Sequence, residues 1–137
     1  MKKYKNERGQ SLVEMAISLV LVLLLLSGVV EFGIAFFQFI QLRDAAQEGA
    51  LYGATNPTDT DGITARIQGS SNTPIDLTTV TPVIIYENSS KKCEGWGITI
   101  QLTFNHKVFM PFIPQVIGSS TIPLKASVTD TILYPAC

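Results

Sequence analysis

A carboxylate near the start of a long apolar stretch is the first group whose type and position suggest chemistry. Gly9 ends a short basic leader, and Glu14 follows five positions later, inside the apolar stretch. An ionised side chain in a membrane helix costs about 2.5–3.5 kcal/mol on insertion scales and is usually functional. Glu14 therefore either makes a functional contact or extends its carboxylate to the lipid headgroups at the membrane surface. We expect Glu31, the second carboxylate of this stretch, at the outer interface or bonded to a neighbouring polar group.

Other side chains offer little chemistry. His106 is the only histidine, and because no Ser/His/Asp set surrounds it, we expect it on the surface and predict no catalytic residue. No phosphate-binding, dinucleotide-binding or EF-hand motif occurs, so we predict no cofactor, no metal and no enzyme activity. The formal net charge of −1 excludes a strongly basic nucleic-acid-binding protein, and no nucleic-acid partner is expected.

The two cysteines, Cys93 and Cys137, do not form a metal-binding pair. If the strand near residues 97–108 pairs antiparallel with the strand near residues 121–133, both cysteines lie at the same end of the sheet. A disulfide there would stabilise the fold by up to about 4 kcal/mol on the chain-entropy model. The alternative is two free thiols in a reducing compartment.

The elements that must position these groups begin with the apolar stretch itself. Residues 1–9 carry a net charge of +3 and residues 41–137 a net charge of −2, whereas residues 12–40 contain only Glu14 and Glu31 as charged side chains. A basic head before an apolar run stays in the cytoplasm, so the C-terminal part is expected outside the membrane. The run exceeds the roughly 7–15 apolar residues of a signal peptide. We therefore predict a retained membrane helix, with a buried core helix as the alternative.

The same helix is expected to continue beyond the membrane, because no proline occurs before Pro57. Its second half carries two adjacent rows of small residues spaced by four, which allow another backbone to approach closely. This face seats either the chain's own sheet or a helix of another subunit, or both. The small residues are Ala45, Ala46, Gly49, Ala50, Gly53 and Ala54.

Beyond the helix the pattern changes to alternation. Residues 63–67 favour a short helix, and residues 98–104 and 122–128 alternate apolar and polar side chains, which predicts strands with one buried face. Residues 80–87 form a third, less regular run. We expect an antiparallel sheet of three or four strands on the outer half of the long helix.

Three blocks carry a resemblance to a known family. RGQSLVEMA (residues 8–16), EFG (residues 31–33) and DAAQEGA (residues 44–50) occur in order. The Gly9/Gln10 junction with Glu14 resembles the leader of type IV pilin-like proteins, and the three blocks together resemble the TadE-like family of tight-adherence pilus proteins. Gln10 as the first mature residue and the lack of an early proline point away from a standard type IVa pilin.

The resemblance implies a mechanism. A prepilin peptidase would cut between Gly9 and Gln10, and Glu14 of one subunit would pair with the new α-amine of another. Glu31 is a second candidate for subunit assembly. The family further implies partners: other pilin subunits in a homo- or hetero-oligomer, the pilus assembly machinery, and the cytoplasmic membrane before export into an extracellular, adhesive filament.

The sequence thus predicts an α+β, pilin-like protein: a long N-terminal spine helix followed by a small antiparallel sheet domain. We expect a leader over residues 1–9, the hydrophobic helix over residues 10–54 with a membrane span of about 15–37, and an extracytoplasmic domain over residues 55–137. The expected function is that of a pilin or minor pilin. The alternative is a monomeric membrane-anchored binding module.

Overall fold

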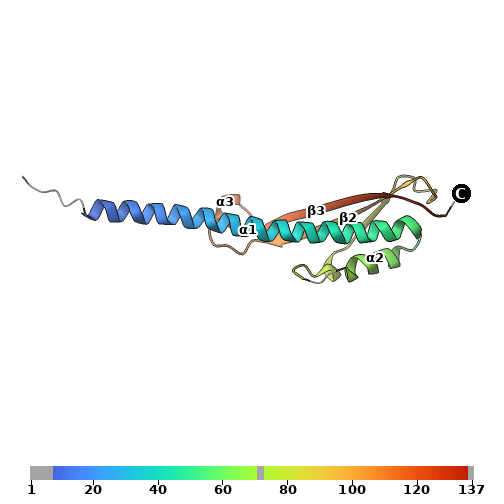
Figure 1. Ribbon diagram of the computed structural model, residues 1–137, viewed down its shortest axis with the longest axis horizontal. Helices are drawn as coiled ribbons and strands as arrows, with labels where there is room; N and C mark the ends of the chain where they lie inside the picture. The colour runs from blue at the N-terminus through green and yellow to red at the C-terminus, as the bar shows by residue number, and fades with distance from the viewer. Residues whose placement is uncertain (1–7, 71–72, 136–137) are drawn as a thin grey trace, which may run out of the picture.

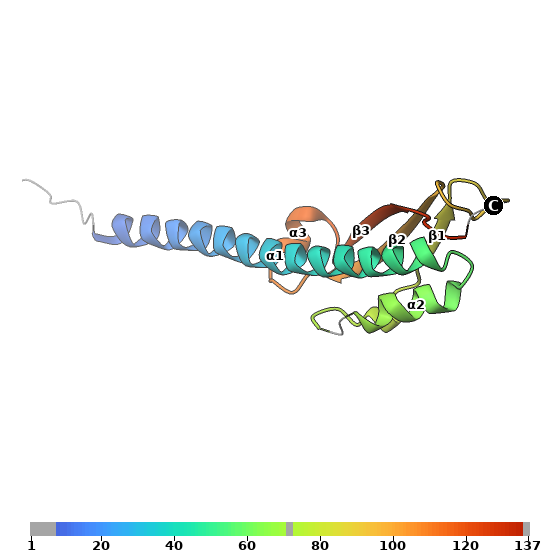
Figure 2. The ribbon, with the colours of Figure 1, turned by 45° about the vertical axis from the view of Figure 1, so that its right-hand side comes forward.

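The computed structural model describes residues 8–70 and 73–135. Its elements run in the order α1, α2, a 3₁₀ turn η1, β1, β2, α3 and β3. One long helix forms the axis of the molecule. The sheet and α2 lie along its C-terminal half, and α3 lies beside its middle (Figure 1). A turned view shows the sheet on one side of α1 and α2 on another (Figure 2). The predicted α+β layout is confirmed.

Helix α1 spans Arg8–Thr55, in agreement with the prediction of one uninterrupted helix. Its 48 residues correspond to about 72 Å at 1.5 Å per residue. The helix ends two residues before Pro57, which is expected because proline has no backbone N–H to donate to a helical hydrogen bond. The predicted boundary between residues 9 and 10 falls within the first turns of α1, and residues 1–7 of the predicted leader lie outside the described residues.

Helix α2 spans Thr60–Gly69 and includes the short helix predicted at residues 63–67. Asp59 caps it, because its carboxylate accepts the backbone N–H of Gly62 at 2.9 Å. The hydroxyl of Tyr52 on α1 donates to the same carboxylate at 2.8 Å. This cap therefore joins the start of α2 to the end of α1. The turn η1 follows at Leu77–Thr79.

The sheet contains three antiparallel strands in the order β1-β2-β3. Strand β1 spans Val83–Tyr86, β2 spans Gly97–Lys107 and β3 spans Thr121–Thr131. The register pairs Gly97 with Thr131 and Lys107 with Thr121, so the two long strands match along their whole length. Both predicted alternating runs are strands, and the irregular third run contains the short edge strand. The five-residue helix α3, Ile113–Ile117, lies between β2 and β3.

The core lies between the sheet, α2 and the C-terminal half of α1. Strand β2 contributes its inward residues, including Ile98, Ile100 and Leu102, while Ile63 and Ile67 come from α2. The small-residue face of α1 lies beneath them: its four alanines are at most 1% exposed. A Cβ added at Gly53 would lie 2.7 Å from Ile98 Cδ1. The structure therefore uses the small residues inside the chain, to bring the sheet and α2 close to the α1 backbone.

Gly49 provides a test of this close approach. A Cβ at Gly49 would lie 2.5 Å from Ile67 Cγ1, whereas nothing lies within 4 Å of one at Gly33. We expect Gly49→Val to lower the free energy of unfolding by about 1–3 kcal/mol through overpacking. Gly33→Val on the same helix should change it by about 0.5 kcal/mol or less. Thermal unfolding in detergent micelles measures both, and equal effects would contradict the assigned packing.

The cap at Asp59 makes stability depend on pH. The Gly62 N–H, and next the Tyr52 hydroxyl, hold the pKa of the Asp59 carboxyl below its usual value. A group whose pKa is lower in the folded state stabilises the fold above its unfolded pKa, about 3.9, and loses this contribution as pH falls through the folded pKa. We expect Asp59→Ala to lower the unfolding temperature at neutral pH, with the difference from the unsubstituted protein disappearing below about pH 4.

The same contact raises the pKa of Tyr52, because the phenol donates to the Asp59 carboxylate. In Asp59→Ala the pKa of Tyr52 should fall back toward about 10, which titration of the phenolate absorbance detects. Asp61→Ala is the control, because it removes a carboxylate from the first turn of α2 and leaves Asp59 in place. An identical response of the two variants would exclude the proposed cap.

Candidate functional site

Most of the N-terminal half of α1, residues 9–30, extends beyond the rest of the protein, and α3 lies beside it at Gly28 (Figure 1). Its large aliphatic side chains are mostly 47–69% exposed, from Leu12 to Val30. The helix is long and apolar enough to cross a membrane, and none of its most apolar 18-residue window is buried. Within the described residues this excludes the alternative of a buried core helix. The candidate functional surface is therefore a bare apolar cylinder.

Glu14 lies on this exposed cylinder. It lines a shallow, open depression together with Gly9, Gln10, Val13 and Ile17. The Ser18 hydroxyl donates to the backbone carbonyl of Glu14 at 2.9 Å, a contact that leaves the carboxylate itself uninvolved. The junction residues and Glu14 thus lie together on the first turns of α1, open to a partner.

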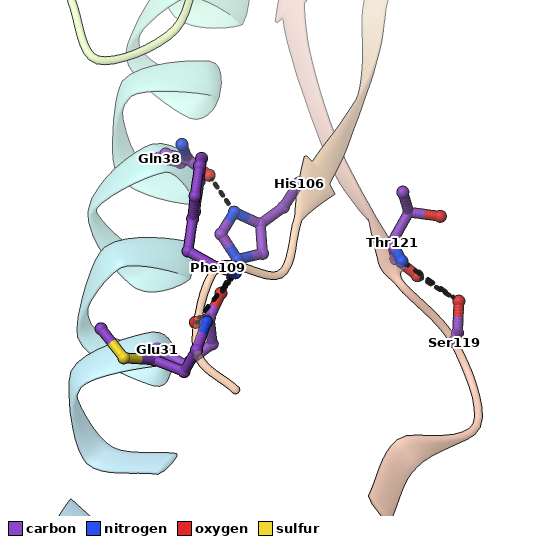
Figure 3. A network of polar contacts seen from close by, with 7 residues as sticks. Glu31, Gln38, His106, Phe109, Ser119 and Thr121 are labelled. Atoms are coloured by element: carbon purple, nitrogen blue, oxygen red, sulfur yellow. Dashed lines mark hydrogen bonds and ion pairs between the residues drawn. The ribbon is translucent and has the colours of Figure 1, made fainter. Parts of the chain in front are cut away.

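Glu31 has a different environment from Glu14, because it is buried and bonded within the chain. One carboxylate oxygen lies 2.7 Å from Nε2 of His106. The backbone N–H of Phe109 donates to both oxygens at 3.1 and 3.2 Å, and that of Met110 donates to Oε2 at 2.8 Å. Nδ1 of His106 lies 2.6 Å from Oε1 of Gln38 (Figure 3). We call these five residues the Glu31 network.

The buried carboxylate of Glu31 is satisfied by its contacts. The imidazole of His106 faces it through Nε2, and the backbone N–H groups of Phe109 and Met110 donate to it. On its other side, the imidazole faces the side-chain amide of Gln38 through Nδ1. A buried carboxylate requires partners of this kind.

The network fixes one end of the sheet to α1. His106 is the penultimate residue of β2, and the two amides that bind Glu31 come from the next residues along the chain. The following connection, Val108–Ser120, is closed at its base by a Val108 N–H to Ser120 carbonyl bond of 3.0 Å. Ser119 and Thr121 bond to each other at the return of the chain (Figure 3). We call this connection the 108–120 loop.

The expectation that His106 lies on the surface is wrong, since its exposed fraction is zero. The sequence contained a signal for this. The alternation that places Ile98, Ile100 and Leu102 on the inward face continues through position 106, so the histidine falls on the buried side of β2. Its partner Gln38 interrupts a run of aromatic and aliphatic residues seven positions after Glu31, on the same face of α1.

Glu14 and Glu31, both predicted to act in subunit assembly, are not brought together. They are 17 positions apart on α1, which is about 25 Å along a helix. Glu14 is exposed and Glu31 is buried. An assembly role for Glu31 remains a prediction, and any such role acts through the way it positions the sheet.

Cys93 is buried beside the C-terminal end of the described chain. The backbone N–H of Glu94 donates to the carbonyl of Pro135 at 2.9 Å, which places the segment of Cys93 next to the segment that leads to Cys137. Cys137 itself lies outside the described residues, so its pairing with Cys93 remains a prediction.

An apolar groove of about 380 Å³ lies beside the Glu31 network. Its walls come from α1, the 108–120 loop and β3, and Phe32, Phe36, Ile113 and Leu124 are among the residues that line it. Among residues 8–70 and 73–135, no group of three or more His, Cys, Asp or Glu side chains is arranged to hold a metal ion. Glu31, the charged residue that lines the groove, is bonded to His106 and to backbone N–H groups. The rest of the lining can make apolar contacts with a partner.

A comparison with known families finds a match in the N-terminal region. Residues 9–51 match the TadE-like protein family. The resemblance inferred from the sequence is therefore confirmed over most of α1, a segment that includes Glu14, Glu31, Gln38 and most of the small-residue face. The match ends before α2 and the sheet begin. No curated protein and no solved structure matches the chain.

The Glu31 network gives a direct prediction for the stability of the protein. His106→Ala removes the imidazole that faces the buried carboxylate of Glu31, so we expect a loss of about 3 kcal/mol in the free energy of unfolding. Asn105→Ala, at the exposed neighbouring position, should cost about 0.5 kcal/mol or less. Fluorescence of Trp96 during unfolding in detergent micelles measures both.

A double-mutant cycle separates the contact between Glu31 and His106 from general packing. Glu31→Gln and His106→Ala combined should differ from the sum of the single effects by about 1 kcal/mol or more, because both remove the same interaction. Additive effects would show that the two residues contribute independently to stability, and would contradict the contact between them that the structure shows.

Proposed function

We propose that this protein is a pilin or minor pilin that assembles through α1 into an extracellular filament used for adhesion. The TadE-like match indicates a protein associated with the Tad pilus. The single observation that carries the more specific proposal is the bare apolar cylinder at residues 9–30. Such a surface requires either lipid or other apolar helices around it.

The exposed cylinder suits both stages of this function. Before assembly it would lie in the cytoplasmic membrane, with the basic head inside and the sheet domain outside. During assembly, lipid would be exchanged for the helices of neighbouring subunits. Since lipid tails are as apolar as leucine, this exchange needs little hydrophobic driving force and depends on packing and polar contacts.

Glu14 supplies the polar contact. Cleavage between Gly9 and Gln10 by a prepilin peptidase would leave a positively charged α-amine four residues before Glu14. The carboxylate is exposed on the same end of the helix, so in an assembled bundle it would pair with the α-amine of a neighbouring copy or of a related pilin. A pair in low dielectric would set the register between subunits.

The C-terminal half of α1 has a separate task in this proposal. Its small-residue face is covered by α2 and the sheet, and the Glu31 network fixes the sheet at one height on the helix. Each subunit would therefore present its outer domain at a constant distance from its membrane-embedded end. A constant spacing of this kind is what a regular filament requires, because every copy makes the same contacts.

Glu14→Ala tests the assembly mechanism. We expect filament yield to fall roughly tenfold or more, since loss of 1.4 kcal/mol per contact reduces an association constant tenfold. Glu48→Ala, an exposed carboxylate on the outer half of the same helix, is the matched control and should leave filament yield unchanged. Electron microscopy and immunoblotting of sheared surface fractions measure the yield.

The mature N-terminus discriminates between the proposal and the monomeric anchor. Mass spectrometry of the protein from its native cells should find Gln10 as the first residue. Retention of Met1 together with normal behaviour of Glu14→Ala would favour a membrane-anchored binding module and would reject the filament proposal.

A further inference from the structure

We propose that the 108–120 loop enters the outer leaflet of the membrane beside α1, so that the protein contacts the bilayer with a second segment besides its helix. The inference rests on the proposed membrane placement of α1. Among the described residues of the sheet domain, this loop reaches furthest along α1 toward its N-terminal end, as the position of α3 beside α1 shows (Figure 2).

The composition of the loop fits a lipid environment. No charged residue occurs between Lys107 and Lys125. The loop nevertheless exposes large apolar side chains: Phe109 is 66%, Phe112 65% and Val116 69% exposed. Apolar side chains grouped in this way on one uncharged loop mark a surface that is covered by a partner or by a membrane.

The depth of the loop follows from its contacts with α1. A Cβ added at Gly28 would lie 4.0 Å from Ile113 Cδ1 of α3, and Glu31 binds the amides of Phe109 and Met110. The hydrocarbon core of a bilayer is about 30 Å thick, or about 20 helical residues. If it begins as early as Leu12, its outer boundary lies near Glu31, and Gly28 is already about 4–5 Å inside it. Any later start places the loop deeper.

The polar backbone groups at the base of the loop are paired, as a position at the outer boundary of the hydrocarbon core requires. Its two ends are joined by the Val108–Ser120 bond, and Glu31 together with His106 satisfies the backbone donors where the chain leaves β2. Unpaired backbone groups are costly in hydrocarbon, so this arrangement lets the apolar tip enter lipid while the polar groups at the entrance are paired. Lys107 is exposed just before the loop, where its ammonium group can reach the headgroups.

Phe112 has a backbone conformation that supports the same assignment. Its φ is +73°, in the left-handed region that non-glycine residues rarely adopt, and it precedes Ile113 at the start of α3. Phe112 is 65% exposed in this conformation. Burial of its ring in lipid would offset the local strain.

Quenching of tryptophan by lipid measures the depth. The full-length protein, with Trp96→Phe as background, is placed in vesicles of phosphatidylcholine and phosphatidylglycerol whose acyl chains carry bromine. We expect the emission of Phe112→Trp to fall roughly twofold or more relative to vesicles without bromine, because the indole would lie among the acyl chains. Val116→Trp is a second reporter, since its exposed position places few packing demands on the fold.

Two controls separate this inference from the proposed function. Trp96 of the unsubstituted protein, next to Gly97 at the opposite end of β2, should show no quenching. Leu21→Trp, on the exposed cylinder, should be quenched if α1 lies in the membrane. Quenching at Leu21→Trp without quenching at either loop position overturns the loop proposal and leaves the membrane helix standing.

Two further outcomes have defined meanings. If none of the reporters is quenched, α1 does not occupy the bilayer, and both the membrane placement and the loop proposal fail. If the loop reporters show blue-shifted emission that bromine does not quench, protein covers the loop, as it would between two copies of this chain, and the lipid assignment is overturned.

Discussion

The position of the sheet along α1 depends on the carboxylate of Glu31. It lies on a helix that is otherwise apolar around it, and it is bonded to one imidazole and two backbone amides from a segment more than 70 positions away. Helix–sheet packing through alanine and glycine gives contact but little resistance to sliding by a turn, because the small residues repeat every four positions. The bonds of the Glu31 carboxylate fit one position of the sheet, and displacement would leave this buried group without partners. The Glu31 network thus fixes the register at the His106 end of β2, while a bond from the Leu133 N–H to the Ala54 carbonyl joins the other end of the sheet to α1.

This register divides α1 into two parts with opposite surroundings. On the N-terminal side of Glu31 the helix is apolar and bare; on the C-terminal side it is covered by α2 and the sheet. A continuous helix without proline joins the two parts, so a displacement of the bare part is transmitted to the covered part through a rigid rod. Phe32, Phe36 and Phe37 remain exposed just above Glu31, where the covered and bare parts meet. Contacts at that level would affect both parts of the molecule at once.

The sequence predicted the elements better than it predicted the contact between them. Helical continuity follows from residue types within α1, and the alternation at residues 98–104 and 122–128 is local information that needs no partner. The antiparallel pairing of the two long strands entered the sequence analysis only as a condition, because alternation within a strand does not identify its neighbour. The Glu31 network required knowledge of which height on α1 meets the end of β2, and no local pattern contains that distance. His106 was misplaced because the absence of a catalytic context was read as surface exposure, although its position in the alternation indicated burial.

The burial of the small-residue face restricts how copies of this chain can associate. Rows of alanine and glycine usually allow two helices to approach closely, but here α2 and β2 already occupy that approach, with Ile67 and Ile98 directly over Gly49 and Gly53. A second helix would have to displace part of the core. The chain's own core therefore blocks association through the small-residue face, whereas the bare cylinder at residues 9–30 and the exposed phenylalanines that follow it are open to another copy. Glu14 is the carboxylate on that cylinder, and a pair made there has no competing partner from the described part of its own domain, in contrast to Glu31.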